Sequence, residues 1–196
     1  MKTTLLLMLC LLMACTQVFA QTIPKGELNF TFATGTNVIL EPQLDGAGSY
    51  NGEGFYGIGL SYLKPLNNWL SMETGLAYTN YTVSVTPGFY PGREMATRTS
   101  SLALLSVPIT ARANFWKYLF VQAGVVADFE TKSSFVDDQS GIGFIAGVGL
   151  KYSFSPKVSA FVNPFLQQHA VIAFRAQNYQ QSMLDAGVRL GIGLTL

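Results

Sequence analysis

Cysteine, histidine and charged residues are all scarce in this chain. Its two cysteines, Cys10 and Cys15, lie close to the N-terminus, and His169 is the only histidine. Charged residues make up 12% of the sequence, which is about half the share that is usual in soluble domains. These shortages argue against a disulfide scaffold, against a metal site built from cysteine and histidine, and against a basic surface for nucleic acid.

Long apolar runs are also missing after the first twenty residues, which excludes transmembrane helices of about 20 apolar residues. The N-terminus itself predicts a cleaved signal peptide over residues 1–20. Lys2 is followed by the apolar stretch 5–14, and small residues precede Gln21.

Cleavage at this point would remove both cysteines and leave residues 21–196 as one domain, with 11 basic and 11 acidic residues once Lys2 is lost. A second interpretation, in which Cys15 is lipidated, fits the usual motif less well because of Met13.

What the chain does contain is alternation. From Leu184 to Leu196 every even position is apolar and every odd position is small, polar or charged. This period of two predicts a β-strand with one face toward lipid. The same alternation, less pure, occurs in seven further segments: 27–37, 55–62, 69–82, 105–112, 119–129, 142–152 and 157–167. Pro108 predicts a bulge or a local break in one of these strands, and Asn163-Pro164 interrupts another.

The connections between these segments alternate between long and short. The long ones are 39–51, 84–98, 130–140 and 168–181, and the short ones are 65–68, 114–117 and 155–157. This order predicts an all-β fold, an eight-stranded antiparallel up-and-down transmembrane β-barrel with short periplasmic turns and long extracellular loops. Aromatic residues gather at the short turns and predict a periplasmic girdle at the headgroup level: Tyr62, Trp69, Phe115, Trp116, Tyr118, Tyr152 and Phe154.

The signal with Gln21 after it, the strand and loop plan and the terminal strand AGVRLGIGLTL resemble the small eight-stranded outer-membrane barrels of the OmpX/OmpW type. Among them the chain is most similar to the PorT-like outer membrane beta-barrel proteins of Bacteroidota. The resemblance implies a place in a Gram-negative outer membrane, contact with its lipid, and recognition of the last strand by the outer-membrane assembly machinery. Many proteobacterial barrels end in an aromatic residue, whereas this chain ends in Leu196.

Several charged residues have the inward parity: Glu73, Arg112, Asp128, Lys151, Asp185 and Arg189. An eight-stranded barrel is just wide enough to be filled by side chains, and charges inside it must pair or meet water. We therefore interpret these residues as an ion-pair network that plugs the lumen, with a narrow polar conduit as the alternative.

Inward glycines are frequent, and inward Phe55, Phe120, Phe161 and Phe165 could fill the space beside them. A small internal pocket for an apolar ligand is the alternative interpretation.

An enzyme that modifies lipid A would need a positioned base and nucleophile. His169 is the only candidate base, with Ser182 and Asp185 on the following strand, but a lone histidine near a loop is usually a surface residue. The sequence therefore favours a non-enzymatic, porin-like protein without a cofactor, in a structural role or binding an unknown partner through its loops. A narrow pore or transporter for a small or apolar solute is the alternative.

Overall fold

The computed structural model describes residues 25–40, 49–86, 96–132, 138–175 and 181–196. The predicted signal peptide and the middle parts of the four long loops lie outside these residues. Among these residues, no helix has the length and the apolar composition that crossing a membrane requires.

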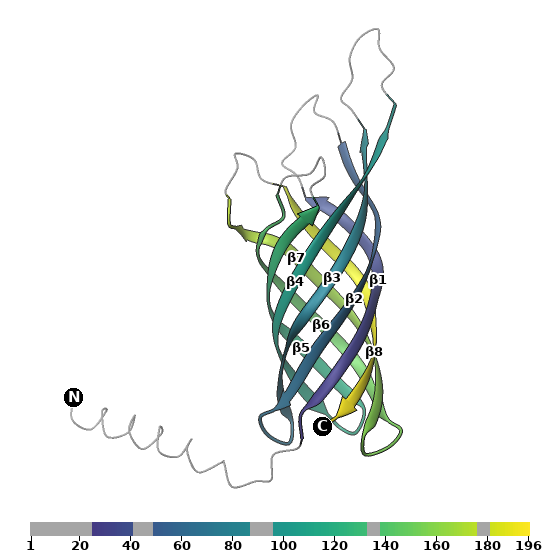
Figure 1. Cartoon of the computed structure of the whole chain (residues 1–196), viewed down its shortest axis with the longest axis vertical. Coiled ribbons are helices and arrows are strands. Elements are labelled where there is room, and N and C mark those ends of the chain that lie inside the picture. The colour runs from purple at the N-terminus through teal and green to yellow at the C-terminus, as the bar shows by residue number, and fades with distance from the viewer. Residues whose placement is uncertain (1–24, 41–48, 87–95, 133–137, 176–180) are drawn as a thin grey trace, which may run out of the picture.

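Eight strands form a closed antiparallel barrel in chain order, in which β8 pairs with β1 (Figure 1). The all-β, up-and-down barrel predicted from the alternation is confirmed. The strands are β1 (Glu27–Leu40), β2 (Ser49–Pro65), β3 (Leu70–Thr86), β4 (Arg98–Phe115), β5 (Leu119–Lys132), β6 (Gly141–Ser153), β7 (Val158–Ala173) and β8 (Ser182–Thr195).

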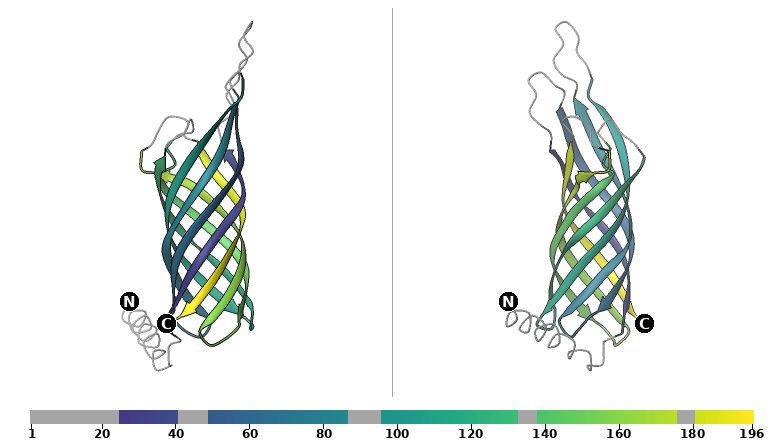
Figure 2. Two further views of the ribbon diagram at one scale, coloured as in Figure 1. Left: turned by 45° about the vertical axis from the view of Figure 1, so that its right-hand side comes forward. Right: turned by 90° about the vertical axis from the view of Figure 1, so that its left-hand side faces the viewer.

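The short connections lie together at one end of the barrel, where β1 begins and β8 ends (Figure 1). We call this end the periplasmic rim and the opposite end the extracellular rim. At the extracellular rim β2, β3 and β4 rise above the other strands (Figure 2), and the β3–β4 ladder continues as far as Val85 and Arg98.

These three strands are longer than the sequence predicted, and the loop expected at 84–98 is correspondingly shorter. The alternation of apolar residues marks only the part of a strand that meets lipid. Polar residues such as Ser84 and Thr99, which pair with each other above that part, carry no such signal.

The strands are strongly tilted. Following paired residues around the barrel from Glu27 leads back to β1 at Asn37, ten residues further along the strand. A displacement of this size in eight strands corresponds to a tilt of about 40°. Each strand therefore contributes inward side chains to several levels of the lumen.

The two prolines interrupt the ladders without breaking the strands. Beside Pro108 the pairing of β3 with β4 stops at Thr74–Ile109 and resumes at Ala77–Ser106 in the same register. In β7, Pro164 lacks the N–H that a neighbouring strand needs. The side-chain amide of Asn163 donates instead to the carbonyl oxygen of Val148, at 2.7 Å.

Inward glycines and phenylalanines complement each other, as the sequence indicated. A Cβ on Gly149 would collide with the ring of Phe120, and one on Gly191 with the ring of Phe161. Both rings are buried. The glycines therefore make room for large side chains at the directly paired positions of the neighbouring strands.

Candidate functional site: the barrel lumen

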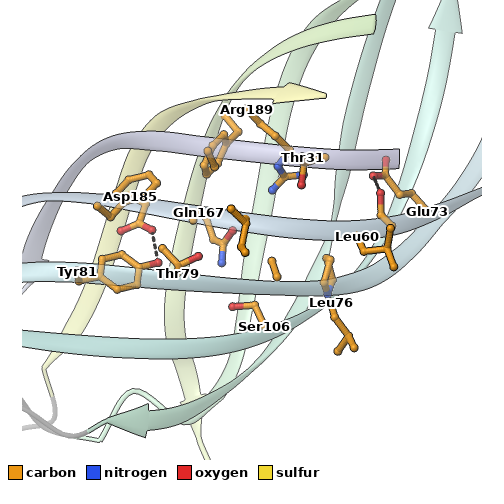
Figure 3. Close-up of a pocket in the computed structure, with 18 residues that line it drawn as sticks. Thr31, Leu60, Glu73, Leu76, Thr79, Tyr81, Ser106, Gln167, Asp185 and Arg189 are labelled. Atoms are coloured by element: carbon orange, nitrogen blue, oxygen red, sulfur yellow. Dashed lines mark hydrogen bonds between the residues drawn. The ribbon is translucent and has the colours of Figure 1, made fainter. Parts of the chain in front are cut away.

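The largest ion cluster in the lumen centres on His169 of β7, toward the extracellular rim. Its Nδ1 lies 2.8 Å from Oδ2 of Asp128 on β5, and its Nε2 lies 3.0 Å from Oδ2 of Asp185 on β8. The hydroxyl of Tyr81 on β3 donates to the same oxygen of Asp185 at 2.8 Å (Figure 3). Ser106 on β4 donates to Oδ1 of Asp128 at 2.6 Å. The cluster thus connects five strands across the lumen.

The contacts of His169 define its protonation. A carboxylate accepts hydrogen bonds and cannot donate them, so both ring nitrogens donate only when the imidazole carries both protons. The side chains of His169 and Asp128 are fully buried, and that of Asp185 is 2% exposed. We therefore describe the cluster as one buried imidazolium between two buried carboxylates.

The expectation that His169 is a surface residue is wrong. The sequence pattern ended the seventh strand at residue 167, whereas β7 continues to Ala173 and keeps His169 on the inward parity of Phe161 and Phe165. Asp185 does reach the histidine. The serine in the cluster is Ser106, which donates to Asp128 instead of to the imidazole.

A second ion pair lies lower in the lumen. Nη2 of Arg112 on β4 contacts Oε2 of Glu73 on β3 at 2.5 Å, and Ser61 donates to the other carboxylate oxygen at 2.6 Å. The guanidinium carbon of Arg112 lies 4.2 Å from the centre of the Phe120 ring and 5.1 Å from that of Phe161. The charge of Arg112, which is fully buried, is therefore balanced by a carboxylate and covered by aromatic faces.

A third pair closes the periplasmic end of the lumen. Lys151 on β6 forms a salt bridge with Glu27 on β1, and Ser159 on β7 donates to the same carboxylate at 2.7 Å. Glu27 was missed by the sequence analysis, although it has the inward parity of its strand. Tyr81, also missed, shares the parity of Glu73.

Arg189 is the inward charge without a direct ionic partner among the described residues. It lines a chamber of about 40 Å³ between the two larger ion clusters (Figure 3). Its guanidinium carbon lies 5.0 Å from the centre of the Phe165 ring. Asp185 lines one part of the chamber and Glu73 another. The volume suffices for a few water molecules but not for a solute.

The charges in these three ion clusters and the chamber wall balance when His169 is protonated. Among the described residues, four carboxylates (Glu27, Glu73, Asp128 and Asp185) and four cations (Arg112, Lys151, His169 and Arg189) take part in them. All six charged residues named from the sequence therefore either form an ion pair or line the chamber. Glu27 and His169 take part in the same clusters.

Polar atoms without partners mark the lower lumen. Among the described residues these are both side-chain polar atoms of Asn29, Nε and Nη1 of Arg112, Nε2 of Gln122 and Oδ1 of Asn163. Buried polar groups of this kind in proteins usually bind internal water. Across the described ranges no group of three or more histidine, cysteine or carboxylate side chains could hold a metal ion.

The aromatic residues expected in a girdle lie on the outer surface near the periplasmic rim. All seven are exposed, and Trp116 is the most exposed at 92%. The rings of Tyr118 and Tyr152 stack with centres 5.9 Å apart, and Tyr152 also meets Phe154.

Comparison with known families identifies the barrel. The family model described as outer membrane protein beta-barrel domain matches residues 6–188. The chain belongs to this family. An outer-membrane beta-barrel domain of this kind lies in the outer membrane, with its apolar outer wall in lipid.

Two solved structures are similar to this outer-membrane barrel at low sequence identity, and the first of them, OprG, shares its fold. OprG from Pseudomonas aeruginosa has a TM-score of 0.58 and 13% identity, over 89% of this chain and 97% of that one. Ail of Yersinia pestis, solved in complex with the heparin analogue sucrose octasulfate, has a TM-score of 0.46 and 15% identity, over 88% and 99% of the two chains. No curated protein matches the chain.

Proposed function

We propose that this protein is a non-enzymatic outer-membrane barrel whose lumen is closed to solutes and which acts through its extracellular side. The observation that carries the proposal is the filling of the lumen. Ion pairs lie at three levels of the lumen, large aromatic side chains occupy the space beside the glycines, and the chamber around Arg189 has room for only a few waters.

The extracellular side offers a surface for a partner. The ladder of β4 with β5 ends at Ala103 and Lys132, and that of β1 with β2 ends at Gly35 and Phe55. Above these pairs β2, β3 and β4 continue as a three-stranded extension (Figure 2). In the described part of the chain, the edge of β4 from Arg98 to Leu102 lies outside the β4–β5 ladder. Exposed strand edges of this kind bind extended peptides by strand addition.

Single-channel recording tests the closed lumen. The protein, refolded and inserted into a planar bilayer, is expected to give no reproducible conductance steps in potassium chloride. A heat-dependent shift in gel mobility establishes that the inserted protein is folded. Steps from folded protein that change when Arg189 is replaced by glutamine would refute the closed lumen.

A narrow pore for a small or apolar solute is the second candidate, and Arg189 is the observation that favours it. An intramembrane charge without a direct partner often marks a solute path. The chamber and the unpartnered polar atoms below it provide a polar column through part of the barrel.

Lipid A modification is the least supported candidate. His169 is fully buried and both of its nitrogens contact carboxylates, so neither can activate a nucleophile. We expect lipid A from cells that carry His169→Ala to have the same mass spectrum as lipid A from wild-type cells. A change in acylation would restore the enzyme hypothesis.

Export completes the proposal. We infer that residues 1–20 direct secretion and are removed, and that the assembly machinery recognises β8. Sequencing the N-terminus of the protein from outer membranes tests cleavage before Gln21. The same measurement distinguishes the lipidated alternative, which would leave Cys15 at the N-terminus.

A further inference from the structure

The periplasmic rim carries exposed positive charge with no free carboxylate side chain beside it among the described residues. Its exposed lysines, which we call the rim lysines, are Lys25, Lys64, Lys117 and Lys157. Within the described ranges no salt bridge involves any of them. The two described carboxylates in this half of the barrel, Glu27 and Glu73, are buried and pair with Lys151 and Arg112. The α-carboxylate of Leu196 offsets one of the four charges, so this surface keeps a net positive charge.

The rim lysines are distributed around the whole end of the barrel. Lys25 precedes β1, Lys64 lies one residue before the end of β2, Lys117 lies in the β4–β5 turn and Lys157 in the β6–β7 turn. These ends and turns lie together at the base of the barrel (Figure 1). The remaining described acidic residues lie toward the extracellular rim: Glu53, Asp128, Glu130, Asp138 and Asp185. A surface with charge of one sign attracts polyanions, so the periplasmic rim is suited to an anionic partner.

The backbone of this rim is held by hydrogen bonds from one connection to the next. The N–H of Asn114, at the start of the β4–β5 turn, donates to the carbonyl oxygen of Trp69 at 2.6 Å. The N–H of Thr195 at the end of β8 donates to the carbonyl oxygen of Lys157 at 2.9 Å. A rigid surface loses little conformational entropy when a partner binds.

Trp116 differs from the rest of the aromatic girdle. It is 92% exposed, whereas the other six girdle residues are between 39% and 67% exposed and lie against the wall. Its φ is 52°, in the left-handed region that bulky residues seldom adopt. A residue that only anchored the barrel in headgroups would not need this conformation. Strained residues of this kind cluster at binding sites, and Trp116 directly precedes the rim lysine Lys117.

We propose that the rim lysines and Trp116 bind peptidoglycan, the anionic glycopeptide polymer on the periplasmic side of the outer membrane. Carboxylates outnumber amines in its peptides, and these carboxylates would pair with the lysines. The apolar face of a sugar ring would pack on the exposed indole, and tryptophan is a frequent anchor in interfaces. This activity would tie the barrel to the cell wall. It depends neither on the extracellular surface nor on whether the lumen conducts.

Co-sedimentation of the refolded protein, in neutral detergent micelles, with insoluble peptidoglycan sacculi tests the proposal. Sacculi whose carboxyl groups have been amidated are the comparison polymer. One variant combines Lys117→Gln with Lys157→Gln, and the other is Trp116→Asn, which removes the ring and suits a left-handed backbone. The matched control combines Lys132→Gln with Arg175→Gln, two exposed cations of the opposite rim. A heat-dependent gel shift establishes that each variant is folded.

We expect the wild type and the control to sediment equally with native sacculi. The double lysine variant should bind about 25-fold more weakly, since one cation near an anionic surface contributes about fivefold. Trp116→Asn should weaken binding at least about fivefold.

Four results would overturn the proposal. Equal sedimentation with amidated sacculi would refute the carboxylate contact, and undiminished binding by Trp116→Asn would refute the sugar contact. An equal loss in the control would refute the location. If phosphatidylglycerol added to the micelles abolishes sedimentation, the rim lysines bind lipid headgroups instead of peptidoglycan.

Discussion

Replacement of His169 by alanine should destabilise the barrel more than any other single substitution in its upper lumen. The change removes a buried imidazolium whose nitrogens lie 2.8 and 3.0 Å from the carboxylates of Asp128 and Asp185. Both carboxylates would then face each other across the space of the lost ring, roughly 7 Å, where their repulsion is about 2 kcal/mol at an effective dielectric constant of about 20. Two hydrogen bonds between charged groups are lost as well.

The expected loss in the free energy of unfolding is about 3–5 kcal/mol, the usual result of leaving a buried charge uncompensated. Urea unfolding in detergent micelles, followed by the gel-mobility shift of the folded barrel, measures it. The matched control is the triple variant Asp128→Asn, His169→Leu, Asp185→Asn, which removes all three charges. It should lie within about 2 kcal/mol of the wild type, because well-packed neutral groups can replace a buried ion cluster.

Two results would refute this reasoning. If the alanine variant unfolds within about 1 kcal/mol of the wild type, the carboxylates are hydrated and the cluster contributes little. If ¹⁵N spectra of the labelled imidazole at neutral pH show one protonated nitrogen instead of two, the histidine is not an imidazolium.

Three further predictions concern the lower barrel and its outer surface. Asn163→Leu should lower the free energy of unfolding by about 1–2 kcal/mol, because it removes the hydrogen bond to Val148. The loss should be smaller in a Pro164→Ala background, where a backbone N–H at position 164 can donate in its place. A double-mutant cycle measures this coupling. Gly149→Ala should lower the free energy of unfolding in urea by about 1–3 kcal/mol, because the new Cβ collides with the Phe120 ring. If the loss is the same when Phe120 is also replaced by leucine, the collision is not its cause. Trp116 fluorescence should be quenched by headgroup-labelled lipids more strongly than by chain-labelled lipids; the reverse would place this residue outside the girdle.

The barrel could be predicted from the sequence because lipid imposes a strict rule on every second residue. Leu184 to Leu196 displays that rule for a whole strand, and the alternation of long and short connections fixes the order of the strands. The rule ends where lipid ends. Above the membrane β3 and β4 carry polar residues such as Ser84 and Thr99 on the outward parity, so the three-stranded extension could not be predicted from lipid-facing residues.

The contacts in the lumen were harder to predict because they depend on the tilt. Glu73 and Arg112 lie on neighbouring strands and both have the inward parity, so the order of the strands is enough to predict that they lie close together. His169 and Asp128 lie on strands that are not neighbours, and which levels meet depends on the ten-residue displacement around the barrel. That displacement follows from the register of all eight strands, which one sequence does not reveal.

The ion cluster at His169 also bears on how the barrel closes. Asp185 is on β8, the last strand to be made and the one that must find β1. Until it arrives, Tyr81 and one nitrogen of His169 lack their acceptor. β8 brings one carboxylate, Asp185, and one cation, Arg189, so its arrival leaves the net charge of the lumen unchanged. Closure of the seam and completion of the hydrogen bonds around His169 are therefore the same event. We expect partly closed barrels to be poorly populated, since a barrel that lacks its last strand leaves buried donors without an acceptor.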